Sequence, residues 1–191
     1  MGLLEAICII YVRRLGPFHA ASSPETHHHF ETIREACTLI MLVAVAALAG
    51  IDARSRIGCF FFAFGLWDIF YYVGLKWLAN WPSSLLAWDC LFLIPKPWYG
   101  PVLAPILISG YLITACCFQH WRETRGTPLQ WSARVLLLQL AAGVVWYYSF
   151  TEHTEQILSV GFGGVTYSWS LFLVGVLLGV AGLWRAKRSS V

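Results

Sequence analysis

Residues 57–78 read IGCFFFAFGLWDIFYYVGLKWL, an aromatic and apolar run with one acid, Asp68, at its centre. A helix of this length rises by about 33 Å, enough to cross the ~30 Å hydrocarbon core of a bilayer. A carboxyl group at mid-depth in a membrane is costly and usually has a role. The run therefore predicts a transmembrane helix that carries a buried acid.

A segment rich in tryptophan and proline follows this run. Residues 79–105 read ANWPSSLLAWDCLFLIPKPWYGPVLAP and contain a second Trp-Asp pair, Trp88 and Asp89. We expect residues 80–96 to form an outer loop, with a short interfacial helix over 83–94 that is capped by a serine. Two prolines near the start of the next apolar run predict that its helix begins irregularly.

The composition is that of a membrane protein. The chain is 58% hydrophobic, has a mean hydropathy of +0.64 and contains only 12% charged residues, whereas soluble domains are about 25% charged. The formal net charge is +3, and the basic residues are scattered at the ends of apolar runs. Nucleic-acid binding is not expected, because no basic stripe or cluster is present.

The apolar runs predict one membrane domain over residues 1–191, an all-α bundle of five transmembrane helices. The predicted spans lie at about residues 33–51, 57–78, 99–119, 131–150 and 164–184. The run at 2–12 is too short to cross a bilayer, so we expect an N-terminal interfacial helix there. Because the number of spans is odd, the two termini should lie on opposite sides of the membrane.

Basic residues orient this bundle. One set of turns, together with the C-terminal tail, contains eight of them: Arg54, Arg56, Arg122, Arg125, Arg134, Arg185, Lys187 and Arg188. The opposite side contains five: Arg13, Arg14, Arg34, Lys76 and Lys96. The positive-inside rule therefore predicts a cytoplasmic C-terminus and an outer N-terminus. We expect the chain to lie in a plasma (inner) membrane.

Most histidines and acids fall on the predicted outer side, which suggests a metal site. His28, Glu31 and Glu35 share one helix face by their spacing, and His27 pairs with Glu31 one turn away. The candidate ligands for a divalent transition metal are therefore His27, His28 and Glu31 from this helix and His153 from the last outer turn. The alternative is a hydrated histidine run above charged side chains that pair with one another. Haem is not expected, because no span offers paired internal histidines.

Asp68 and Glu35 are the candidate catalytic acids. On a helix, Asp68 shares a face with Tyr71 and Tyr72, whose hydroxyls could satisfy its carboxyl group. One reading is an acid that carries a proton or orients a ligand reached from the outer side. The other reading is a structural hydrogen bond between helices. Its candidate partners are Ser109, Thr114 and Gln139.

Aromatic side chains around these acids could line a ligand pocket, although anchoring at the membrane interface is the commoner role of such residues. The candidate ligand-binding set is Trp67, Tyr71, Tyr72, Trp88, Asp89 and Trp98. In the last predicted span, Gly175, Gly179 and Gly182 have a small-residue spacing that lets a neighbouring helix approach closely. A homo-oligomer could form through that face.

Three functions fit these features. The first is a non-catalytic accessory or hydrophobic-ligand-binding membrane protein, with a lipid-like ligand or other membrane subunits as partners and its polar site in the outer half of the bundle. The second is a small membrane enzyme that applies acid–base or metal chemistry to a lipid-like substrate. The third is a subunit of a proton- or metal-coupled transporter. Because no inverted repeat is visible, a complete monomeric transporter is not expected.

Overall fold

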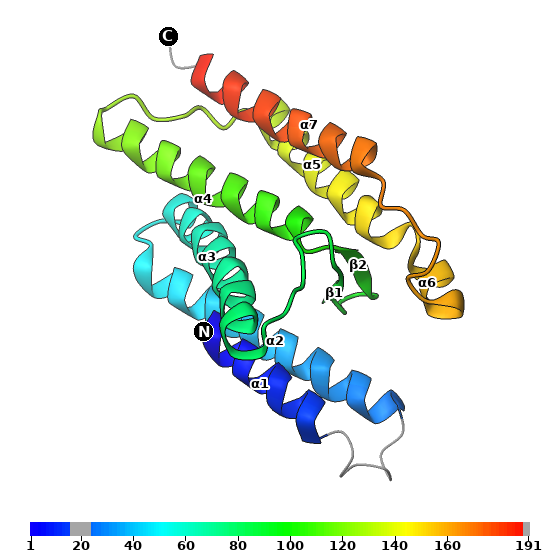
Figure 1. Cartoon of the computed structure of the whole chain (residues 1–191). Helices are drawn as coiled ribbons and strands as arrows, with labels where there is room; N and C mark the ends of the chain where they lie inside the picture. Colours follow the sequence, from blue (N-terminus) through cyan, green and yellow to red (C-terminus); the bar gives the residue numbers. More distant parts are fainter. Residues whose placement is uncertain (16–23, 189–191) are drawn as a thin grey trace.

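The computed structural model describes residues 1–15 and 24–188 and is mainly helical (Figure 1). The helices are α1 (Gly2–Leu15), α2 (Pro24–Ala49), α3 (Ala53–Ala79), α4 (Leu103–Thr124), α5 (Ala133–Thr151), α6 (Thr154–Val160) and α7 (Trp169–Arg188). Two short strands, β1 (Trp88–Phe92) and β2 (Trp98–Pro101), lie between α3 and α4.

Within the described residues, five helical segments are long and apolar enough to cross a membrane. They are His29–Ala49, Ala53–Ala79, Leu103–Thr124, Ala133–Val160 and Trp169–Ala186. The prediction of five apolar helices is confirmed. Many large apolar side chains on these helices are exposed to the surroundings, among them Leu48 and Leu177. This exposure suits a bundle surrounded by lipid, in which apolar side chains need no cover.

The helices form two packed groups (Figure 1). In the first group, α3 packs against α1, α2 and α4. Ala6, Ile9, Tyr72, Leu75 and Val102 form its buried apolar core. In the second group, α5 packs along α7, and Trp146, Phe150 and Phe172 are buried there together with Ala104 of α4.

Helix α3 has well-formed ends. At its start, the Asp52 carboxylate accepts a hydrogen bond from the backbone N–H of Ser55, and the Ser55 hydroxyl accepts one from the Asp52 backbone N–H. This reciprocal cap lowers the pKa of Asp52, chiefly through the backbone N–H of Ser55. At its end, Asn80 adopts a left-handed conformation with φ of 51°. Asparagine tolerates this conformation better than most residues do.

The segment between α3 and α4 forms a β-hairpin, so the predicted interfacial helix over 83–94 is wrong. Strands β1 and β2 pair antiparallel, and Asp89 lies opposite Gly100. Backbone polar groups need partners in a membrane protein as elsewhere, and the hairpin supplies them by cross-strand pairing. Because Trp98–Pro101 belongs to the sheet, α4 begins at Leu103 and not at the predicted residue 99.

The glycines of α7 contact side chains of the same chain. A methyl group built on Gly175 would lie 2.5 Å from Trp146 Nε1, and one on Gly182 would lie 2.5 Å from Gln139 Nε2. A methyl group built on Gly179 would lie 3.0 Å from the Tyr111 ring of α4. The close approach predicted from the glycine spacing is therefore made within one chain. A second copy could use this face only if those side chains moved, and the homo-oligomer stays a prediction.

Candidate functional site

Asp68 is sealed between α3 and α4. Its side chain is almost fully buried, and Oδ2 accepts a hydrogen bond of 2.8 Å from the Ser109 hydroxyl. Gly65, one turn earlier on α3, allows this approach, because a Cβ atom there would lie 2.9 Å from the Ser109 carbonyl oxygen. Ser109 is one of the three partners proposed for the structural reading of Asp68. The other two proposed partners do not bond to Asp68. Thr114 bonds to Gly110, and Gln139 bonds to Tyr111 and Gly179.

Asp89 reaches into the first helix group from strand β1. Its side chain is buried, and the Tyr72 hydroxyl of α3 donates a hydrogen bond of 3.1 Å to Oδ2. Tyr72 was expected as a partner of Asp68, but its hydroxyl bonds to the acid of the hairpin. Asp89 of the second Trp-Asp pair therefore connects the hairpin to α3 by a hydrogen bond.

Glu35 ties the hairpin to α2. Its carboxylate is buried and accepts a hydrogen bond of 2.9 Å from the backbone N–H of Leu93, just after strand β1. Because the N–H of Leu93 is part of the hairpin backbone, this bond fixes the position of the hairpin along α2. The carboxylates of Glu35, Asp68 and Asp89 thus each hold a different element against another.

A second polar cluster joins α1 to α2. The Glu5 carboxylate of α1 is buried and accepts hydrogen bonds from Arg34 and from the Thr38 hydroxyl of α2. Arg34 also bonds to Glu31, at 2.8 Å. The alternative reading, in which charged side chains above the first span pair with one another, is realised for Glu31 and Arg34. Arg34 has an additional partner, Glu5, which belongs to the N-terminal helix α1.

The two metal candidates whose side chains are described, Glu31 and His153, each pair with another residue. No group of three His, Cys, Asp or Glu side chains among the described residues could hold a metal ion. Glu31 is engaged by Arg34, and His153 lies beside Glu152 at the junction of α5 and α6. The side chains of His27 and His28 lie outside the described residues, so their part in a metal site stays a prediction.

The candidate ligand-binding aromatics lie in the hairpin and on the face of α3 that packs against it. Trp67 and Trp98 both pack against Phe92 of β1, with ring centroids 6.3 and 5.8 Å away. Tyr71 stacks on Trp67. Trp88, the first residue of β1, packs instead against Phe162 and Tyr167. The set is thus divided, and most of it packs against the hairpin.

The indole N–H groups of Trp67 and Trp98 are buried and have no hydrogen-bond partner among the described residues. The ring of Trp98 also stacks on Phe150 of α5, with centroids 6.2 Å apart. An unpaired indole N–H inside a protein has a free-energy cost. Packing around Phe92 and Phe150 offsets this cost, because buried aromatic pairs contribute beyond their area.

Two ionisable groups outside the membrane-spanning segments, Cys90 and Tyr167, have raised pKa values. Loss of hydration, followed by the charges of Asp89 and Glu35, raises the pKa of Cys90 to about 12. Burial likewise raises the pKa of Tyr167, whose hydroxyl lies 3.0 Å from that of Ser149. These shifts keep the thiol and the phenol neutral near pH 7, so neither supplies an anion for nucleophilic chemistry.

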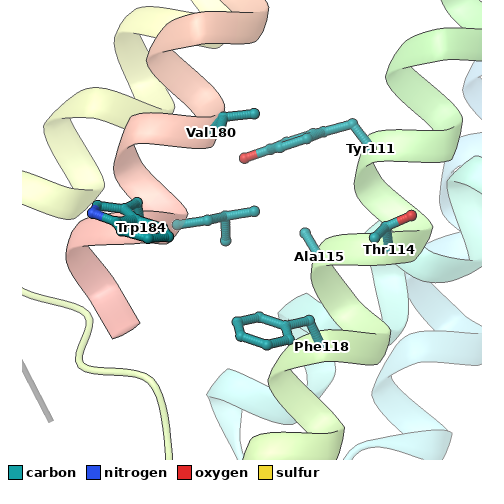
Figure 2. A pocket seen from close by; sticks show the side chains of 7 residues that line it. Tyr111, Thr114, Ala115, Phe118, Val180 and Trp184 are labelled. Atoms are coloured by element: carbon teal, nitrogen blue, oxygen red, sulfur yellow. The ribbon is translucent and has the colours of Figure 1, made fainter. Parts of the chain in front are cut away.

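An open apolar groove lies between α4 and α7, with a volume of 370 Å³. Figure 2 shows Tyr111, Thr114, Ala115 and Phe118 on the α4 side, facing Val180 and Trp184 on the α7 side. Leu183 completes the lining. Apart from the hydroxyls of Tyr111 and Thr114 and the indole nitrogen of Trp184, these side chains are apolar. The amino-acid sequence does not mark this groove, because the groove depends on how α4 and α7 are placed relative to each other.

One hydrogen-bonded link holds the two walls of the groove. The Tyr111 hydroxyl donates a bond of 2.8 Å to Gln139 Oε1, and Gln139 Nε2 donates one of 2.9 Å to the Gly179 carbonyl. Gln139 therefore connects α4, α5 and α7 at one end of the groove.

Comparison with protein-family models, with curated proteins and with solved structures finds no match for this chain.

Proposed function

We propose that this chain is an integral membrane protein that binds a lipid-like molecule without chemical turnover. The observation that carries the proposal is the groove between α4 and α7. Its volume of 370 Å³ falls within the range of small-molecule sites, and its lining is almost entirely apolar. Both walls belong to helices that could cross a membrane.

The acids of the predicted outer half support binding over catalysis. A catalytic acid needs to reach the atom it protonates. Asp68 bonds to Ser109, Asp89 to Tyr72 and Glu35 to Leu93, so each carboxylate is engaged in holding elements together. The site expected in the outer half is therefore replaced in this proposal by the groove.

The positive-inside rule supports an orientation in the plasma membrane with a cytoplasmic C-terminus and an outer N-terminus. In that orientation α1 starts beside the middle of α3, where Gly2 lies against Trp67 and Tyr71, and runs toward the outer end, where Ala6 lies against Gly74. The groove then lies toward the cytoplasmic leaflet, since it is lined by the second half of α7.

Native mass spectrometry of the protein in mild detergent tests the proposal. We expect the wild-type protein to retain lipid, Ala115→Trp to lose it because the indole fills the groove, and Ala115→Leu to retain an intermediate amount. Ala47→Trp, an equal change at an exposed position of α2, is the matched control and should retain lipid.

Wild-type protein without lipid would refute the proposal. Equal retention by all variants would move the site away from the groove. A monodisperse gel-filtration peak and an unchanged melting temperature show that Ala115→Trp has folded. If it has not, the graded loss in Ala115→Leu decides the question.

A further inference from the structure

The α4 wall of the groove continues into basic residues. The lining residues Tyr111, Thr114, Ala115 and Phe118 recur every three or four positions, so they occupy one face of the helix. The same spacing, continued from Phe118, reaches Arg122 and then Arg125, which caps the C-terminus of α4. A molecule lying along this wall would therefore meet guanidinium groups at its far end.

Arg185, near the end of α7, lies away from the groove. Val180, Leu183 and Trp184 line the groove. Arg185 is turned about 160° from Leu183 around the helix axis. Helices α4 and α7 run in the same direction in Figure 1, so the ends that carry Arg125 and Arg185 lie at the same end of the molecule.

Positive charge at this end exceeds the carboxylates that could neutralise it. Glu123 pairs with Arg54 at 3.3 Å, and Asp52 caps α3. Arg125 forms no ion pair with any described residue, and its guanidinium lies 4.2 Å from the centre of the Trp121 ring. An exposed tryptophan stacked by arginine suits the headgroup level of a bilayer.

The groove is open and lined almost entirely by apolar side chains. The lining residues of α4, from Tyr111 to Phe118, cover about 10 Å of helix. A linear hydrocarbon chain could lie along this length and place a headgroup at the basic end of α4.

We propose that the ligand is an anionic phospholipid of the leaflet at the basic end of the bundle. One acyl chain lies in the groove between α4 and α7, and the phosphate lies at the basic rim, against Arg125 and beside Arg122. Arginine favours phosphate because its planar fork of N–H groups matches the oxygens. This inference rests on the proposed function and names the ligand class.

The test is a competition between two lipids with identical acyl chains. Purified full-length protein is exchanged into nanodiscs with equal amounts of phosphatidylglycerol and phosphatidylcholine, and native mass spectrometry measures the ratio of the two bound lipids. We expect wild-type protein to favour phosphatidylglycerol and Arg125→Gln to lower that preference about fivefold, the effect of one basic residue near an anionic surface. Arg185→Gln removes the same charge away from the groove face and should keep the preference within about twofold of wild type.

The outcomes separate the inference from the proposed function. Equal binding of both lipids, lost in Ala115→Trp, would overturn the anionic preference and leave the lipid-binding function standing. No bound lipid of either kind would refute both. An equal loss of preference in Arg125→Gln and Arg185→Gln would show that general charge attracts the lipid, and would overturn the assignment to the groove rim.

Discussion

A single hydroxyl group satisfies the carboxyl of Asp68, the acid at the centre of the most aromatic helix. The pattern of residues 57–78 predicts a buried acid, and it is buried between α3 and α4. Sequence spacing left several partners open, because the choice depends on how α4 is rotated about its axis. Glycine at position 65 sets that rotation by letting the Ser109 backbone approach.

Removal of the Ser109 hydroxyl should destabilise the fold. We expect Ser109→Ala to lower the free energy of unfolding by roughly 1–3 kcal/mol, because it leaves a buried carboxyl group without its partner. Thermal unfolding in detergent, followed by circular dichroism, measures the change. Ser159→Ala, an exposed hydroxyl on α6, is the control and should have little effect. A Ser109→Ala protein as stable as wild type would show that another group satisfies Asp68.

Cys90 should react slowly with maleimides although it lies at the surface. Its pKa is raised to about 12, so the reactive thiolate is scarce at pH 8 and becomes more abundant as the pH rises toward 12. The labelling rate, measured by mass spectrometry of a variant that keeps only this cysteine, should increase about tenfold per pH unit between 8 and 11. A rate that levels off near pH 9 would contradict the shift. Replacement of Glu35 by Gln removes one of the negative charges and should raise the rate at pH 8.

At the scale of elements, the sequence predicted the helices well and the hairpin poorly. Long charge-free runs identify spans because hydrocarbon excludes charge over a fixed thickness. The segments WDCLF and WYGP are short apolar runs with aromatic residues, which periodicity alone cannot assign to strand or helix. The bond from Glu35 to Leu93 was missed for a related reason, since a backbone N–H leaves no mark in a sequence.

Loss of the Glu35 carboxylate should loosen the hairpin. We expect Glu35→Ala to speed amide hydrogen exchange at Leu93 and through strand β1, because the exchanging N–H loses its acceptor. Hydrogen-exchange mass spectrometry of peptides covering residues 88–101 measures the effect. Glu155→Ala, at an exposed position of α6, should leave these peptides unchanged. If exchange at Leu93 does not change in Glu35→Ala, strand pairing alone protects the hairpin.

At the scale of the molecule, two helix groups meet through few links. The hairpin joins them where Gly100 and Trp98 pack against Phe150. Gln139 joins them again, along the edge of the groove. The composition predicted a bundle, but it carried no information about this division, which follows from where small and large side chains meet.

Replacement of Gln139 by Leu should widen the distribution of distances across the groove. The leucine cannot bond to Tyr111 or to the Gly179 carbonyl, so α4 and α7 lose their shared partner. Double electron–electron resonance between spin labels at positions 114 and 180 in a cysteine-free background measures the spread. A label pair at 137 and 174, within the second helix group, should keep a narrow distribution. An unchanged spread at 114 and 180 would show that packing alone holds the groove.

The glycine at position 65 also has a consequence for which sequences this fold tolerates. Alanine is the better helix former by about 1 kcal/mol, so it should be accepted at Gly110, where a methyl group would meet nothing within 4 Å. At Gly65 the same methyl group would force α3 away from α4 and separate Asp68 from its hydroxyl. In a library of random variants selected for stable expression, alanine should accumulate at position 110 and vanish from position 65, although the two glycines lie on facing helices and look alike in the sequence.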